Sequence, residues 1–276
     1  MRLSILTDNN TFIDRYYLAE PGLSILIEDS GKKILFDCGF SDVFWHNARI
    51  MGRDLLFLDY LIFSHSHLDH TWGVEKLIRE HTIASLEGIE HRRPEVIAHP
   101  QALKGVEFSP GVNIGPLVGP QEMQACYSMN LTKNPVQLTD RLFFLGEIPR
   151  SNDFEGLVSI GVKAGETTPD FMHDDTALAC KTEEGLIIIT GCSHSGICNI
   201  VEHARNVCGE NRVKSIIGGL HLQDPAQDVL RETSRFLAEL NLDSLYAGHC
   251  TDLASKIALA GDNPVMEMGS GMVLEF

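Results

Sequence analysis

The sequence has no long uninterrupted apolar segment. No run approaches the roughly 18 apolar residues that a membrane-spanning helix needs. The apolar stretch near the N-terminus, "LSIL", is too short for the hydrophobic part of a signal peptide and is typical of a first strand. We therefore expect no membrane partner.

Positive charge is also scarce. The chain has 22 Lys and Arg against 38 Asp and Glu, a formal net charge of −16. Its densest basic spot is Arg92-Arg93, and acidic residues flank it at Glu90 and Glu95. Nucleic acid is repelled by such a surface unless a local basic stripe exists. We expect a small-molecule substrate and no nucleic-acid partner, and the oligomeric state stays open.

The seven cysteines are scattered, and no pair has C-x-x-C spacing. This pattern fits a reduced, cytoplasmic protein better than a disulfide framework. The chain also lacks a linker, a repeat or a low-complexity block that would separate two domains. We therefore expect one domain over residues 1–276.

Apolar runs alternate with amphipathic stretches along the whole chain. Residues 23–39 and 176–191 each read as a hairpin, and a buried strand precedes the segment "SHSHLDH". The helices are expected at residues 42–51, 71–81, 197–208, 225–240 and 251–260. Hairpins mixed with strand–helix units predict an α/β (α+β) fold in which helices flank mixed sheets.

Two Gly- and Pro-containing segments interrupt this pattern. Residues 103–134, with "FSPGVNIGPLVGP" at their centre, predict loops in an irregular insertion that lies near the functional edge. The later segment "LVSIGVKAG" resumes the apolar alternation and predicts a strand.

The segment His65-Ser66-His67-Leu68-Asp69-His70 carries the chemistry. In an extended chain, residues two apart point the same way, so His65 and His67 can bind one metal ion. Asp69 and His70 start a helix and favour a second, adjacent ion. Imidazole with one carboxylate suits zinc, and also manganese or iron. The alternative is a set of surface histidines at a helix start.

Further ligand types follow three later strands. His194, His221 and His249 each come directly after an apolar run. Strand ends of α/β proteins face a crevice, which is where such proteins place their chemistry. Asp174-Asp175 precede a strand and could bridge metals or orient an imidazole, and capping of a strand or helix is the alternative.

These motifs together resemble a known family. The motif H-x-H-x-D-H and the stretches "ILFDCG", "DDTAL", "GCSHSGICNI", "GGLHL" and "GHCT" are similar to the metallo-β-lactamase superfamily. They resemble the branch of metal-dependent hydrolases, lactamase superfamily II, that includes proteins labelled dihydropterin-ribofuranosylaminobenzene-phosphate synthase. The resemblance implies a four-layer αββα sandwich of two mixed sheets with helices outside and a dinuclear metal site at one edge.

The resemblance also implies roles for individual residues. One metal would be held by His65, His67 and His194, and the other by Asp69, His70 and His249. Asp69 would also be the catalytic residue that orients the attacking water. Asp37, in "ILFDCG", would lie near the site.

Several positions depart from the family pattern. The usual bridging aspartate is replaced by Cys192 in "TGC", so the bridge could be Cys192, Asp175 or absent. His173 competes with His194 for the third histidine of the first metal. Likewise, His221 and His249 compete for the last ligand position.

The expected activity follows from two divalent ions. A metal-activated hydroxide would attack a small ester, phosphoester or cyclic substrate. The alternatives are a non-hydrolytic synthase or lyase of a methanopterin-like pathway and a metal-holding binding or regulatory protein with little turnover. Weak candidates for substrate contacts are Arg150 and Trp72.

Overall fold

The computed structural model describes residues 1–276. The chain forms two compact units, each assembled from separate stretches. Unit 1 consists of Met1–Thr132, Gly161–Pro169 and Gly269–Phe276, and unit 2 of Lys133–Ile160 and Asp170–Met268. The single domain expected over residues 1–276 stays a prediction.

Unit 1 is built on a seven-stranded mixed sheet. In pairing order its strands are β17 (Val273–Glu275), β1 (Arg2–Thr7), β2 (Ser24–Asp29), β3 (Lys32–Phe36), β4 (Tyr60–Ile62), β5 (Glu95–Ala98) and β8 (Ser128–Leu131). Strands β17 to β3 pair antiparallel, and β3, β4, β5 and β8 pair parallel. The hairpin predicted over residues 23–39 is confirmed as β2 and β3.

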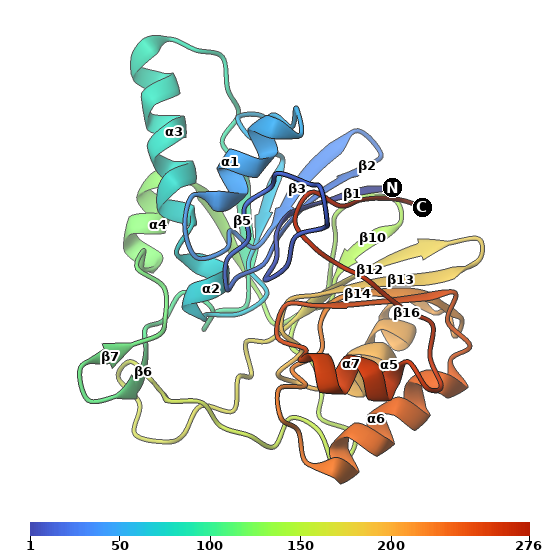
Figure 1. The fold of residues 1–276 in the computed structure, drawn as a ribbon. Coiled ribbons are helices and arrows are strands. Elements are labelled where there is room, and N and C mark those ends of the chain that lie inside the picture. The colour runs from blue at the N-terminus through green and yellow to red at the C-terminus, as the bar shows by residue number, and fades with distance from the viewer. The chain divides into compact units, whose positions relative to one another are not determined.

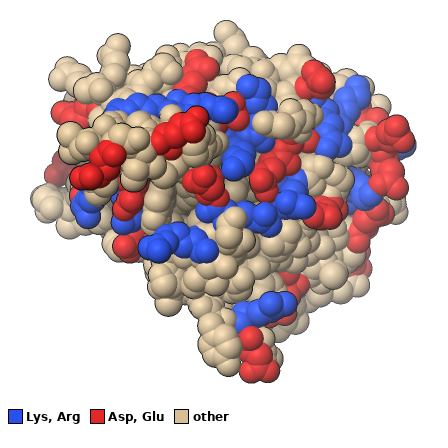
Figure 2. All heavy atoms as spheres, turned by 90° about the horizontal axis from the view of Figure 1, so that it is seen from above, with Lys and Arg blue, Asp and Glu red and all other residues tan.

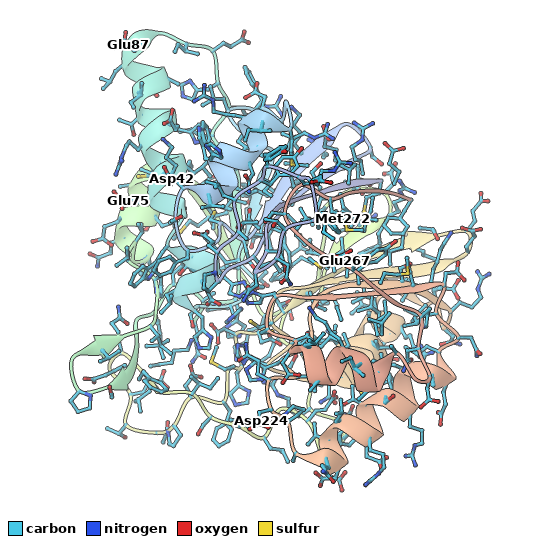
Figure 3. All side chains as sticks on the ribbon, viewed as in Figure 1. Asp42, Glu75, Glu87, Asp224, Glu267 and Met272 are labelled. Atoms are coloured by element: carbon cyan, nitrogen blue, oxygen red, sulfur yellow. The ribbon has the colours of Figure 1, made fainter.

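Four helices belong to unit 1: α1 (Val43–Ile50), α2 (Leu68–Thr71), α3 (Val74–Glu87) and α4 (Pro120–Cys126). The long helix α3 ends at Gly88, whose left-handed φ of 68° suits a residue without a Cβ. Its ends are labelled Glu75 and Glu87 in Figure 3. Apolar side chains of α1 and α3, among them Phe44 and Leu77, share one core cluster with the sheet.

A small third sheet corrects two predictions. Its strands are β11 (Val162–Lys163), β6 (Val106–Ser109) and β7 (Val112–Asn113). The expectation of loops over 103–134 was wrong in part, because this segment forms β6, β7, α4 and β8. The strand expected in "LVSIGVKAG" is reduced to two residues that pair with β6. Glycine and proline mark turns locally, whereas this pairing joins residues far apart in sequence.

Unit 2 has a second seven-stranded mixed sheet. In pairing order its strands are β16 (Val265–Met266), β15 (Ser244–Gly248), β14 (Val213–Gly219), β13 (Gly185–Thr190), β12 (Ala177–Thr182), β10 (Leu142–Phe144) and β9 (Val136–Gln137). Strands β13 to β16 pair parallel and the others antiparallel. Figure 1 shows the helices of this unit, α5 (Ile197–Cys208), α6 (Gln227–Glu239) and α7 (Leu253–Leu259), beside the sheet.

Helix α5 packs most deeply in unit 2. Its bounds match the predicted helix over 197–208, and it ends before Gly209, which adopts a left-handed φ of 59°. The side chains of Ile197, Ile200 and Val201 share one apolar cluster with those of β12, β13 and β14. The mixed sheets flanked by helices that the sequence predicts are confirmed.

Both units place ligand-type residues at the carboxyl ends of parallel strands. In unit 1, Asp37 follows β3 and His65 comes shortly after β4. In unit 2, Cys192, His221 and His249 follow β13, β14 and β15. The carboxyl ends of neighbouring parallel strands meet at one edge, so each unit gathers these side chains locally.

The exposed charges are mixed in sign. Figure 2 shows Lys and Arg lying among Asp and Glu on the face that it presents. Arg92 contacts Asp59 at 2.5 Å, and Arg53 contacts Glu28 at 3.6 Å. No helix combines the length and the apolar character that a membrane crossing requires.

Gly73, just before α3, allows a close approach of the main chain. A Cβ at this position would lie 2.0 Å from the carbonyl oxygen of Cys38 and 2.7 Å from that of Ser41. We predict that Gly73→Ala lowers the free energy of unfolding by about 1–3 kcal/mol, as overpacking does, in urea unfolding monitored by circular dichroism.

The control for this substitution is Gly105→Ala. A Cβ there would meet only ordinary contacts, 3.6 Å from the Ala164 Cβ and 3.7 Å from Asn113 Oδ1. This variant should unfold within about 0.5–1 kcal/mol of the parent. Equal stability of the two variants would contradict the steric account.

Candidate metal centre

Three imidazoles of the histidine motif converge in unit 1. The chain is extended at His67, with φ −66° and ψ 151°, and α2 begins at the next residue. The ring centroids of His65 and His67 lie 4.8 Å apart, and those of His65 and His70 lie 4.2 Å apart. All three side chains are buried.

A buried carboxylate fixes the orientation of His70. Its Nδ1 lies 2.6 Å from Oδ2 of Asp37. Because an ionised carboxylate only accepts hydrogen bonds, the proton of this imidazole lies on Nδ1 and the lone pair on Nε2. Ligand histidines in metal sites are typically held this way through their second nitrogen. The Asp69 carboxylate lies 3.8 Å from His70 Nε2, so both offer donor atoms to one location.

Ser64 links Asp37 to His65 by hydrogen bonds and so fixes the orientation of the His65 ring. Its backbone N–H and its hydroxyl both donate to Asp37, at 2.7 and 2.6 Å. The hydroxyl has one proton, so it accepts the 2.9 Å hydrogen bond from Nδ1–H of His65. The Nε2 of His65 therefore also carries the lone pair. Asp37, which sequence resemblance placed near the site, orients two of the predicted ligands.

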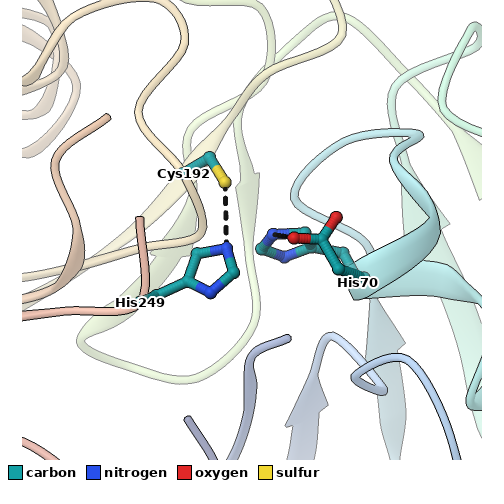
Figure 4. Close-up of side chains that lie close together, drawn as sticks. His70, Cys192 and His249 are labelled. Atoms are coloured by element: carbon teal, nitrogen blue, oxygen red, sulfur yellow. Dashed lines mark hydrogen bonds and ion pairs between the residues drawn. The ribbon is translucent and has the colours of Figure 1, made fainter. Parts of the chain in front are cut away.

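Unit 2 gathers a thiol and two imidazoles. Nε2 of His249 lies 3.1 Å from Sγ of Cys192, the contact drawn in Figure 4. The Cys192 sulfur is within 4.8 Å of a ring nitrogen of His194 as well as of His249. All three residues are at least nine-tenths buried. The Cys192 sulfur is therefore close to both predicted histidine ligands of this unit.

The competing histidines take different positions. His173 is exposed in the loop before β12, whereas His194 is buried beside Cys192. The His221 ring lies 4.2 Å from the His194 ring, and the His221 backbone N–H donates to Cys250 Sγ at 3.2 Å. His194 and His249 each have a ring nitrogen within 4.8 Å of Cys192 Sγ.

Asp175 supports the turn that carries His194. Its Oδ2 accepts from the backbone N–H and the hydroxyl of Ser195, at 2.8 and 2.5 Å. Burial raises the pKa of Asp175 to about 6. The carboxylate is therefore anchored to the main chain next to a predicted ligand.

Arg150, a weak candidate for substrate contact, is engaged with main chain. Its guanidinium donates to the carbonyl oxygens of Ile148, Phe171 and Met172 at 2.9–3.0 Å. These bonds hold the loop that leads to Asp174-Asp175. A direct substrate contact of Arg150 stays a prediction.

The sequence interpretation missed Lys163. This side chain is only 2% exposed, and its Nζ donates to Oγ of Ser66 at 2.5 Å, inside the histidine motif. Lys163 reaches Ser66 because β11 pairs with β6. A short irregular strand 97 residues away carries no local signal for this contact.

The segment after β7 also contacts the motif. The carbonyl oxygen of Ile114 accepts from the backbone N–H of Leu68, and that of Gly115 accepts from Nε1 of Trp72, both at 2.8 Å. Part of the Gly- and Pro-rich segment therefore covers α2 directly.

Histidines and carboxylates at the ends of parallel strands in mixed sheets are candidate metal ligands of an α/β protein. The family model of the metallo-beta-lactamase superfamily matches residues 18–249, and the chain belongs to this superfamily. The membership that the sequence motifs indicated is confirmed.

Two curated relatives come from Methanocaldococcus jannaschii. One is a 7,8-dihydropterin-6-methyl-4-(beta-D-ribofuranosyl)-aminobenzene-5'-phosphate synthase, 31% identical over 85% of this chain and 82% of the relative. The other is an uncharacterized protein, 30% identical over 80% of this chain and 79% of its own length.

A solved structure matches the whole fold. It is a metal-dependent hydrolase of the beta-lactamase superfamily, with a TM-score of 0.82 and 27% identity, covering 100% of this chain and 99% of that chain. The metallo-β-lactamase-like fold is thus confirmed.

The raised pKa of Asp175 predicts a pH dependence of stability. The folded pKa of about 6 lies above the ordinary 3.8, so the folded state binds the proton more tightly than the unfolded chain. The contribution of Asp175 is full below the ordinary value and is lost as the pH rises through 6. The stability of metal-free wild type relative to Asp175→Asn should fall by roughly 2–3 kcal/mol between about pH 4 and about pH 7, in urea unfolding.

The control is Asp252→Asn at the start of α7. Hydrogen bonds from the backbone N–H groups of Asp224 and Ser255 lower the pKa of Asp252, so its contribution is lost as the pH falls. Its difference from wild type should run in the opposite direction and be small, because Asp252 is only partly buried and solvent screens its charge. A pH-independent difference for Asp175→Asn would contradict the account.

Proposed function

We propose that this chain is a metal-dependent hydrolase that acts on a small ester, phosphoester or cyclic substrate. It would use two divalent metal ions, and zinc is the metal that we expect. The observation that carries the proposal is the orientation of the motif histidines. His70 and His65 each engage Nδ1 with a neighbour, Asp37 or Ser64, so that Nε2 has the lone pair that a metal requires. The residues therefore fit the metal that the family implies.

The proposed ligands are those that the sequence resemblance implies, with Cys192 added. They are His65, His67, Asp69, His70, His194, His249 and Cys192. In this assignment, Cys192 takes the place of the bridging aspartate. The short distances from its sulfur to ring nitrogens of His194 and His249 support this role. A thiolate is a good zinc ligand, whereas Asp175 has its carboxylate anchored on Ser195.

The metal ions, Asp69 and Asp37 would have different roles in the reaction. Divalent ions held there would lower the pKa of water and polarise a carbonyl or phosphoryl oxygen. Asp69, whose side chain is 25% exposed, would orient the attacking water and move its proton toward the leaving group. Asp37 would keep His70 in its tautomer during the reaction.

A second candidate is a non-hydrolytic synthase or lyase of a pterin pathway. The observation that favours it is the relative with 31% identity, which is named a synthase. The same metal ligands would serve either reaction, so fold and ligands alone do not separate the two.

The test is metal content and turnover of purified protein. Wild type should contain zinc by elemental analysis and hydrolyse p-nitrophenyl esters or bis(p-nitrophenyl) phosphate. Removing one proposed ligand, by His67→Ala or by His249→Ala, should lower metal affinity by more than the roughly 10–100-fold that loss of a supporting partner costs. The control is His46→Ala, an exposed histidine on α1.

Two outcomes would contradict the proposal. If wild type binds no divalent metal, the whole assignment of metal ligands is wrong. Metal-loaded wild type whose turnover does not exceed that of His67→Ala would count against a hydrolase and direct attention to the synthase reaction of the relative.

A further inference from the structure

An open cavity of about 540 Å³ lies in unit 1, beside the end of α1. Its volume is in the range that is typical of small-molecule sites. No Asp or Glu is among its lining residues. We call it the arginine cavity, and its lining includes Phe12, Arg15 and Tyr17 from the loop after β1, Met51 and Arg53 after α1, and Met272 before β17.

The two guanidinium groups of the cavity are only partly compensated by carboxylates. Nη1 of Arg53 lies 3.6 Å from Oε2 of Glu28, which Arg2 also approaches at 3.7 Å. Nε of Arg53 is buried and has no hydrogen-bond acceptor. Arg15 is exposed on its loop and forms no ion pair with a carboxylate of the chain. The cavity therefore has a net positive charge in a chain whose formal net charge is −16.

The segments that carry the arginines are fixed in place. The buried side chain of Asn47, on α1, donates to the carbonyl oxygens of Leu6 and Leu18 at 2.7 and 2.8 Å and accepts from the backbone N–H of Leu18 at 3.0 Å. The backbone N–H of Arg53 donates to the Ala48 carbonyl oxygen at 2.8 Å. Because the loop and the end of α1 are held before a ligand arrives, binding needs little further ordering of the main chain.

The third segment supplies an apolar wall. The Tyr17 ring packs directly on Gly271, where a Cβ would lie 2.0 Å from Tyr17 Cδ2. Gly271 donates its N–H to the Ile5 carbonyl oxygen, and the Met272 carbonyl oxygen accepts from the Ile5 N–H, both at 2.9 Å. These bonds hold Met272, which is labelled in Figure 3, against β1. Aromatic and thioether side chains thus lie beside the two cationic groups.

We propose that the arginine cavity binds a small organic carboxylate with an apolar body. The planar fork of a guanidinium matches the two oxygens of a carboxylate. Since Glu28 already faces Arg53, the remaining positive charge suits a monoanion better than a dianion. The apolar body would contact Phe12, Tyr17 and Met272 and so leave water. No proposed metal ligand lines the cavity, so this inference is independent of the proposed function.

The test is calorimetric titration of hydrocinnamate, a phenyl ring on a short carboxylate chain, into the full-length protein. Arg15→Met and Arg53→Met keep a long apolar side chain and remove the charge, and each should weaken binding by about 10- to 100-fold. The matched control is Arg49→Met, which removes an exposed arginine of α1 that does not line the cavity. This control should bind hydrocinnamate as wild type does.

Further titrations separate the contributions and the location. Hydrocinnamyl alcohol has the same apolar body without the carboxylate, and acetate has the carboxylate without the body. Each should bind wild type at least about tenfold more weakly than hydrocinnamate does. His67→Ala, in the histidine motif, should bind hydrocinnamate as wild type does, because a carboxylate in the arginine cavity does not need the metal.

Four results would overturn the inference: no binding of hydrocinnamate to wild type at millimolar concentration, equal binding of the alcohol, equal weakening by Arg49→Met, or binding that Arg15→Met retains and His67→Ala loses. Near-ultraviolet circular dichroism checks that each variant is folded, and the exposed Arg15 serves if Arg53→Met unfolds. Metal content and ester turnover are read separately. A protein that binds hydrocinnamate in the cavity without binding metal fails only the proposed function.

Discussion

The buried carboxylate of Asp37 is the constraint on which the histidine motif depends. It accepts hydrogen bonds from Nδ1 of His70 and from the backbone and hydroxyl of Ser64, and Ser64 in turn accepts from His65. The parallel pairing of β3 with β4 sets this arrangement, because the register that places Phe36 beside Ile62 brings Asp37 level with the residues after β4. Asp37 reaches its position with a left-handed φ of 59°. Strain of that kind is typical of functional sites.

In unit 2 a buried carboxylate also fixes the position of a predicted ligand, through the main chain rather than through the imidazole. Asp175 anchors Ser195, and the adjacent His194 is held near Cys192. Ser193 and His249 both have positive φ values, 65° and 46°, so the turns on either side of the thiol are sharp. In each unit a buried carboxylate holds the main chain or an imidazole so that donor atoms gather at strand ends. This organisation suits a metal site better than a set of surface histidines.

The features of this fold that local sequence patterns encode could be predicted from the sequence. The hairpin of β2 and β3, helix α5 and the histidine motif each carry their own periodicity, turn residues or ligand spacing. The contact of Lys163 with Ser66 and the sheet of β6, β7 and β11 depend on pairing between distant segments, and no local pattern encodes them. The arginine cavity was missed for the same reason, because its lining comes from three separate segments. His173 and His194 differ in burial, which the spacing of residues in the sequence does not give.

The proposal stands or falls with Cys192, which would bind the metal together with the neighbouring imidazoles. The most direct measurement is the absorption spectrum of the cobalt(II)-substituted protein, since a thiolate ligand adds a sulfur-to-cobalt charge-transfer band in the near ultraviolet. Wild type should show this band, and Cys192→Ser should lose it while keeping the visible bands of bound cobalt. Cobalt-loaded wild type without the band, or a Cys192→Ser variant that retains it, would contradict the claim.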